Sequence, residues 1–215
     1  RFHTYDHTRI DPTWLHGGGC DFATLVGNSG RPDPSRNKFS IAIGAKTPLN
    51  QIVVTGGIIE QDTQAKPNNY LNTTPTHYRS FRYITFEGDG AGEQFYMSFI
   101  GLHPHAQVMM QKTGGKAKRY RQEREMGPWL ENGIIMISDA DSPYLNELRK
   151  ALDDSPDGDN DIRDGLYWLA KTFSECLVVP AQQSTGLPST TQVRQRPDSP
   201  VSGIRQHVGY GVSNG

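Results

Sequence analysis

Cysteine, long apolar runs and net charge are all scarce in this 215-residue sequence. Cys20 and Cys176 are its only cysteines and lack metal-ligand spacing, so we expect a protein of a reducing compartment. No apolar run approaches the roughly 20 residues of a membrane span, and no signal peptide is visible. These absences argue against a membrane or secreted protein. The net charge of -1 excludes an overall basic nucleic-acid binder, so any DNA contact must come from a local patch.

Several catalytic signatures are also missing. The run Gly114–Ala117 lacks the upstream glycine and the hydroxyl of a nucleotide-binding phosphate loop. Ser29 lacks the spacing of a nucleophile elbow, which excludes that type of serine hydrolase. His103 and His105 flank a proline with no third soft ligand nearby, so a surface turn is favoured over a transition-metal site.

The most informative stretch that is present runs from Asp153 to Cys176. Apolar residues recur at three- or four-residue spacing after Asn160, which predicts an amphipathic helix that begins near Asn160 or Asp161. Asp164 lies one turn inside this helix, on the same face as Asp161. The acids that precede or begin it are Asp153, Asp154, Asp157, Asp159 and Asp161.

Two interpretations of these acids stay open on this stretch alone. Acids at a helix N-terminus cap free N–H groups and suit the helix dipole, which explains one or two of them. A larger crowd of like charges repels unless a cation is present. Oxygen ligands of this kind suit Mg²⁺ or Mn²⁺.

The order of elements predicts an α/β fold: a mixed sheet, antiparallel in its first strands and then parallel, flanked by helices. We expect the segment 1–16 to be an irregular entry segment or the end of a linker, and Gln61–Ser80 to be a long surface excursion. The expected strands are Gly18–Ala23, Lys38–Ala45, Gln51–Glu60, Phe81–Phe86, Gln107–Gln111 and Gly133–Ser138. The expected helices are Ala91–Leu102, Gly115–Glu125, Pro143–Leu152 and the one that begins at Asn160 or Asp161.

Acids from distant parts of the chain are expected to meet in this sheet. Asp21 lies in one predicted strand and Glu87 follows another. Groups at the carboxyl ends of strands converge near the switch in strand order, so both can reach the helix that begins at Asp161. Three such acids would form the oxygen-only cage that a two-metal site needs.

Three motifs in this order resemble the nuclease domain of the terminase large subunit of tailed phages and herpesviruses. Gly19–Ala23 (GCDFA) matches the family's Gly-x-Asp-x-Ala strand, and Phe86–Gly92 (FEGDGAG) matches its later acid followed by a glycine turn and helix. Asp159–Gly165 (DNDIRDG) is a degenerate His-Asp-Asp-x-x-Asp-Ala motif, with Asp159, Asn160 and Gly165 replacing the His, the first Asp and the Ala. The likeness covers Gly17 to Cys176.

The resemblance implies a ribonuclease H-like fold and a Mg²⁺- or Mn²⁺-dependent endonuclease that cuts double-stranded DNA during viral genome packaging. It implies two-metal hydrolysis with Asp21, Glu87 and Asp161 as the catalytic acids, and Asp164 and Asp159 as further metal ligands. Two ions are expected. The expected organisation is an entry segment or linker over 1–16, the nuclease domain over 17–179, and a tail over 180–215 that its Ser-, Thr-, Gln-, Gly- and Pro-rich composition predicts to be extended or disordered.

Double-stranded DNA is the expected partner, and one basic run is the candidate contact. Glu123 and Glu125 dilute this run, so a solvated helix face is an equal alternative. Its basic residues are Lys112, Lys116, Lys118, Arg119, Arg121 and Arg124.

The chain opens at Arg1 rather than Met, so we expect a fragment or a processed piece. The resemblance implies a terminase ATPase domain in the full-length protein. The portal and the small terminase subunit are further candidate partners. The resemblance implies the cytoplasm or nucleus of the infected host cell. A junction resolvase of the same fold, or a catalytically silent DNA- or capsid-binding module, are the alternatives.

Overall fold

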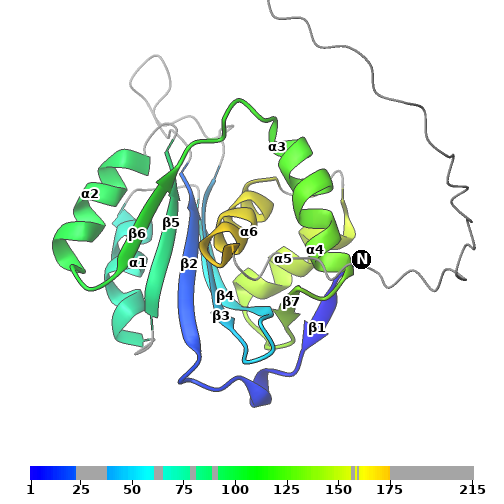
Figure 1. Ribbon diagram of the computed structural model, residues 1–215. Coiled ribbons are helices and arrows are strands. Elements are labelled where there is room, and N and C mark those ends of the chain that lie inside the picture. Colours follow the sequence, from blue (N-terminus) through cyan, green and yellow to red (C-terminus); the bar gives the residue numbers. More distant parts are fainter. Residues whose placement is uncertain are drawn as a thin grey trace, which may run out of the picture. The chain divides into compact units, whose positions relative to one another are not determined.

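The computed structural model describes residues 1–22, 38–60, 65–77, 81–88, 92–155, 158 and 160–174. Seven strands in these ranges form one sheet in the order β1-β7-β4-β3-β2-β5-β6 (Figure 1). The strands are β1 (His3–Tyr5), β2 (Leu15–Asp21), β3 (Phe39–Lys46), β4 (Ile52–Glu60), β5 (Phe81–Glu87), β6 (Gln107–Gln111) and β7 (Ile135–Ser138).

Strand direction follows the prediction of a mixed sheet. β2, β3 and β4 pair antiparallel with one another, whereas β5 pairs parallel to β2 and β6 pairs parallel to β5. β7 is parallel to both β4 and β1. Because β2 and β5 are parallel neighbours, their carboxyl ends lie at the same edge of the sheet.

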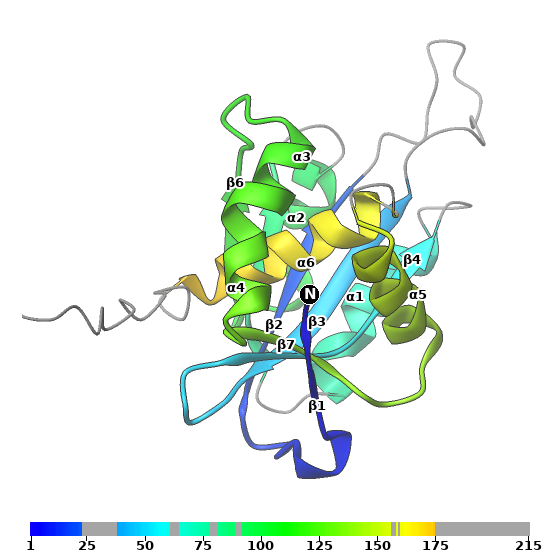
Figure 2. The same cartoon turned by 90° about the vertical axis from the view of Figure 1, so that its right-hand side faces the viewer.

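Helices cover both faces of the sheet (Figures 1 and 2). The helices α1 and α2 pack on one face, and α4, α5 and α6 pack on the other. None of the helices in the described ranges is long and apolar enough to cross a membrane. The helices are α1 (Ala65–His77), α2 (Gly92–Leu102), α3 (Lys118–Tyr120), α4 (Gly127–Glu131), α5 (Pro143–Asp153) and α6 (Asn160–Thr172), with a 3₁₀ turn at His7–Arg9 and a π-helical segment, η2, at Arg121–Met126.

Alternation along β3 divides the interior into two cores. Ile41 and Ile43 point to the core under α1 and α2, and Ala42 points to the core under α4, α5 and α6. This period of two is what a strand with both faces covered requires. On α6 the predicted periodicity is confirmed, since Ile162 and Leu166 are fully buried in the second core.

Two segments that the sequence predicts to be irregular are regular. The segment 1–16 contributes β1, which extends the sheet by parallel pairing with β7, and it also includes the start of β2. The predicted surface excursion Gln61–Ser80 is wrong, because α1 occupies Ala65–His77. Its Leu71 is 2% exposed in the core under α1 and α2. Packing of this residue outweighs the poor helix propensity of the surrounding polar residues.

The helix predicted at Gly115–Glu125 begins later and ends later. Gly114 and Gly115 have φ of 63° and 75°, which belongs to a turn rather than a helix. The helix begins at Lys118 and continues through η2 and α4 to Glu131. Asp159 and the predicted tail over 180–215 lie outside the described residues.

Candidate metal centre

Three buried carboxylates meet at the edge where β2 and β5 end. Asp21 is the last residue of β2 and Glu87 is the last residue of β5, and their side chains are 3% and 8% exposed. Asp164 of α6 is fully buried beside them. Each of the three acids offers an oxygen within 4.8 Å of the others.

Gly165 allows α6 to bring Asp164 to this edge. A Cβ on Gly165 would lie 2.3 Å from the Oγ of Ser40, which is the β3 residue paired with Asp21. An alanine at this position would therefore force the helix or Ser40 to shift. The absence of a side chain at Gly165 is thus part of the local fit between α6 and β3.

Asp161 lies one turn before Asp164 and is held differently. Its Oδ2 accepts a hydrogen bond from the backbone N–H of Lys38 at 2.8 Å, and its Oδ1 accepts one from Lys118 Nζ at 3.0 Å. Asp161 is therefore joined to the three-acid cluster through the Lys118 ammonium.

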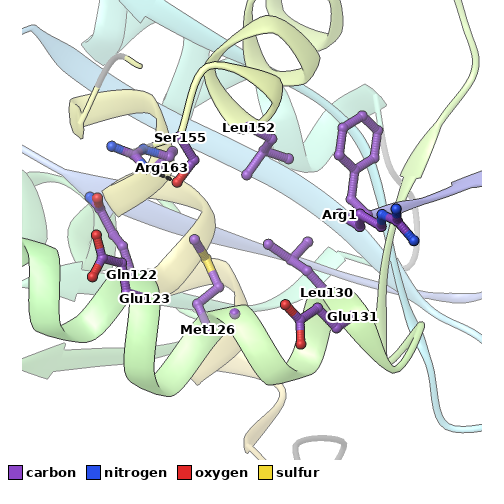
Figure 3. Close-up of a pocket in the computed structure, with 11 residues that line it drawn as sticks. Arg1, Gln122, Glu123, Met126, Leu130, Glu131, Leu152, Ser155 and Arg163 are labelled. Carbon is purple, nitrogen blue, oxygen red and sulfur yellow. Dashed lines mark hydrogen bonds between the residues drawn. The ribbon is translucent and has the colours of Figure 1, made fainter. Parts of the chain in front are cut away.

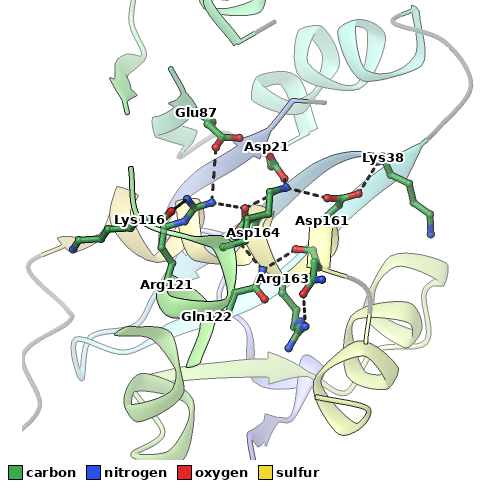
Figure 4. A network of polar contacts seen from close by, with 11 residues as sticks. Asp21, Lys38, Glu87, Lys116, Arg121, Gln122, Asp161, Arg163 and Asp164 are labelled. Carbon is green, nitrogen blue, oxygen red and sulfur yellow. Dashed lines mark hydrogen bonds and ion pairs between the residues drawn. The ribbon is translucent and has the colours of Figure 1, made fainter. Parts of the chain in front are cut away.

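Two cations from the basic run point into the acids. Lys118 Nζ lies 2.9 Å from Asp21 Oδ2 and 3.4 Å from Asp164 Oδ2. Arg121 Nη2 lies 2.5 Å from Asp164 Oδ2 and 3.8 Å from Glu87 Oε1. Figure 4 shows the Arg121 side chain directed at the carboxylates of Glu87 and Asp164.

The π-helical segment η2 is anchored on α6. Gln122 Nε2 donates to the backbone oxygen of Asn160 at 2.8 Å and to Asp164 Oδ1 at 3.2 Å. At the other end, Glu125 accepts a hydrogen bond from Tyr167 Oη at 2.7 Å. A π-helical turn commonly marks a functional site, and this one places Arg121 and Gln122 on opposite oxygens of a single carboxylate.

Burial and crowding change the protonation of the acids. Burial, a hydrogen bond with Asp21, and the charges of Asp21 and Asp164 raise the pKa of Glu87 to about 9. Burial also raises the pKa of Asp164, in spite of the nearby Lys118 and Arg121. Burial opposes the charged form of Lys118, but the carboxylates of Asp21, Asp164 and Asp161 hold its pKa well above the ordinary value.

These residues fit a hard divalent cation. The donors are carboxylate oxygens only, they are buried, and they lie within 4.8 Å of one another. In the metal-free protein the raised pKa of Glu87 keeps a proton in the cluster at neutral pH. A divalent cation at this position would take the place of that proton.

The structure brings together only part of the predicted set. Asp21 and Glu87 converge, but the third member of the cluster is Asp164 rather than Asp161.

Of the predicted DNA contacts, Arg121 is 2% exposed and paired with acids, so it is corrected to an internal partner. Sequence reasoning missed the role of Gln122, which carries no charge pattern. The predicted DNA-contact residues that are exposed at the surface are Lys112, Lys116, Arg119 and Arg124.

A separate pocket of about 250 Å³ lies against η2 and α4 (Figure 3). Its apolar side includes Met126 and Leu130, and its polar side includes Glu123 and Arg163. Gln122, which donates a hydrogen bond to Asp164, also lines this pocket, but none of the three clustered acids does.

No protein-family model matches the chain, and no curated protein sequence matches it. A solved structure does: the large terminase nuclease from the thermophilic phage G20c with bound magnesium. The match has a TM-score of 0.50 and 12% identity, and covers 77% of this chain and 84% of that chain. The fold is ribonuclease H-like.

Two Holliday junction resolvases also match the chain, with lower TM-scores. The fowlpox virus enzyme matches with a TM-score of 0.46 and 12% identity, over 76% of this chain and 100% of that chain. The yeast mitochondrial enzyme matches with a TM-score of 0.47 and 10% identity, over 79% of this chain and 82% of that chain. At 12% identity the match to the phage domain shows the fold alone.

Proposed function

We propose that this chain is a divalent-metal-dependent nuclease that hydrolyses phosphodiester bonds of double-stranded DNA. The observation that carries the proposal is the buried cluster of Asp21, Glu87 and Asp164, whose oxygens lie within 4.8 Å at the carboxyl edge of a ribonuclease H-like sheet. Lys118 and Arg121 offset only part of the charge of the crowded, buried acids, so a purely structural role explains the cluster poorly.

Asp21, Glu87 and Asp164 would hold a Mg²⁺ or Mn²⁺ ion, with Asp161 as a further acid beside them. When bound, such an ion lowers the pKa of water and neutralises charge on a phosphate. The remaining groups of the chain orient the ligands. Arg121 and Gln122 each hold one oxygen of Asp164, so its carboxylate is fixed before a cation arrives.

The exposed part of the basic run supports DNA as the substrate. The segment that places Lys118 and Arg121 against the acids also carries or adjoins four exposed basic residues: Lys112, Lys116, Arg119 and Arg124. Phosphate contacts from these residues would offset the repulsion between the acids and the DNA backbone. Lys116 and Arg119 also pair with Glu125 and Glu123, so Lys112 and Arg124 are the contacts that best test the surface.

We further propose that the nuclease acts in viral genome packaging as the nuclease domain of a terminase large subunit. The order of the three sequence motifs and the similarity to the phage G20c domain support this assignment. The proposed assignment implies an ATPase domain in the full-length protein, contacts with the portal and the small terminase subunit, and a location in the host cytoplasm or nucleus.

Cleavage assays with Mg²⁺, Mn²⁺ or EDTA test the proposal. Supercoiled plasmid and linear duplex should be cut only with the divalent ion, and Asp21→Asn should remove the activity while the variant remains folded. A four-way junction offered in parallel distinguishes the reactions. Preferential cutting of the junction would assign a resolvase, and the absence of cutting on every substrate would point to a silent binding module.

A further inference from the structure

The Lys118 ammonium lies in a second cation position beside the three-acid cluster. Its Nζ is 2.9 Å from Asp21, 3.0 Å from Asp161 and 3.4 Å from Asp164. The cluster itself is bounded by Asp21, Glu87 and Asp164. Two neighbouring positions therefore share Asp21 and Asp164, and the second is bounded on its outer side by Asp161.

Charge limits how many divalent ions fit while Lys118 is in place. The four carboxylates of Asp21, Glu87, Asp161 and Asp164 carry -4 when all are ionised, and Lys118 and Arg121 carry +2, which leaves -2. One divalent ion balances this charge. A second would meet the ammonium as a like charge at close range.

Of the two internal cations, Lys118 is the one that can leave. The Arg121 side chain is 2% exposed, whereas that of Lys118 is 33% exposed. Lys118 begins α3, directly after an exposed turn in which Gly114 and Gly115 have positive φ. Its flexible side chain is within reach of solvent, and a DNA phosphate that reaches this edge offers its ammonium another anion.

We propose that Lys118 occupies the second cation position, so that one divalent ion binds while its ammonium is in place and a second binds only when the ammonium leaves. The inference rests on the proposed function, because it requires the first ion at Asp21, Glu87 and Asp164. It makes Lys118 a positioning residue that couples the arrival of DNA to completion of the metal site.

Counting bound Mn²⁺ by titration calorimetry on the metal-free protein, without DNA, tests this. The parent should bind one ion. Lys118→Met keeps an unbranched side chain and removes the charge, so it should bind two, with the second at least about tenfold tighter than any second event in the parent. Lys150→Met makes the same charge change on the exposed end of α5 and should bind one, as the parent does.

A double variant keeps the test decisive if Lys118→Met is poorly stable. Lys118→Met/Asp161→Asn removes an acid together with the ammonium, which relieves repulsion, and it should again bind one ion because Asp161 bounds the second position. Melting curves of all variants with and without Mn²⁺ give a second readout: Mn²⁺ should raise the midpoint of Lys118→Met more than that of the parent.

The outcomes separate this inference from the proposed function. One ion of unchanged affinity in Lys118→Met, or two ions of similar affinity in the parent, would overturn the role of Lys118 and leave the metal-dependent nuclease intact. Absence of Mn²⁺ binding in both the parent and Lys118→Met would overturn the two proposals together.

Discussion

Gly19 of β2 lies directly against the backbone of Leu169 in α6. A Cβ at Gly19 would be 1.8 Å from the amide nitrogen of Leu169, a distance that no side chain tolerates. The missing side chain lets the helix pack on the strand at backbone contact. Gly19 lies two residues before Asp21 on β2. Its contact with Leu169 therefore positions α6, which carries Asp164, relative to Asp21.

We expect Gly19→Ala to disrupt the site through this contact. The helix must move away from β2, and the overpacking should lower the free energy of unfolding by about 3 kcal/mol. Mn²⁺ binding should weaken in the fraction that remains folded, because Asp164 moves away from Asp21. Urea unfolding and Mn²⁺ titration measure the two effects.

Gly18→Ala is the matched control for this substitution. Its Cβ would meet only the side-chain ends of Ile43 and Ile84, at 3.3 Å, and these can adjust by a few tenths of an ångström. A loss of stability as large as that of Gly19→Ala would show that small residues are needed along the whole strand. The contact between β2 and α6 would then lose its special role.

The raised pKa of Glu87 predicts how stability depends on pH in the metal-free protein. Its pKa is about 9 in the folded state against 4.5 as its ordinary value, so the folded state binds the proton more tightly. The resulting stabilisation is complete below about pH 4.5 and is lost as pH rises toward 9. In EDTA, the melting midpoint of the parent should therefore fall relative to that of Glu87→Gln from pH 5 to pH 9.

The stabilisation that Mn²⁺ provides should depend on pH in the opposite direction. Binding requires the ionised carboxylate of Glu87, so the midpoint increase that Mn²⁺ produces should grow as pH rises. Glu93→Gln, a change at an exposed residue of α2, should keep the behaviour of the parent. A Glu87→Gln variant with the parent's pH profile would refute the assignment of the buried proton to this residue.

The exposed basic residues predict sequence-independent binding of DNA. Lys112→Ala and Arg124→Ala should each weaken binding to all duplexes alike and lower the salt dependence by roughly one released counterion. Filter binding in EDTA over a range of salt concentrations measures both quantities, and Lys150→Ala provides the control. A change that depends on the sequence of the duplex would instead indicate base contacts by the basic run.

The sequence predicts the strand ends of the site well, because they follow from simple periodicity. Strands delivering Asp21 and Glu87 read clearly as apolar or glycine-rich runs, and parallel neighbours bring their carboxyl ends together. The sequence does not predict β1 or α1, since these depend on pairing with β7 and on burial of Leu71. Such tertiary contacts override weak local preferences.

The choice between Asp161 and Asp164 is harder to read from sequence. Both lie on one face of α6, and the depth of each depends on how the helix packs at Gly165 and Ser40. The basic run has the same difficulty. Lys118 contacts Asp161, which lies 43 residues later in the chain, and no local pattern separates such a residue from its solvent-exposed neighbours.

The last prediction distinguishes the two acids of α6. Asp164→Asn should abolish Mn²⁺ binding, because Asp164 belongs to the three-acid cluster. It should also lower the free energy of unfolding by on the order of 3 kcal/mol, because the buried Arg121 then loses its nearest charged partner. Asp161→Asn should bind one Mn²⁺ and lose less stability than Asp164→Asn, because Asp161 lies outside the cluster and an amide oxygen can still accept the Lys38 hydrogen bond.

A second substitution separates the metal from the ion pair in this comparison. Asp164→Asn/Arg121→Met removes both buried charges together and should recover most of the lost stability. It should not recover Mn²⁺ binding, since Arg121 supplies no ligand. Binding of Mn²⁺ that survives in this double variant but is lost in Asp161→Asn would place the first ion at Asp161, and the two acids would exchange the roles that the geometry gives them.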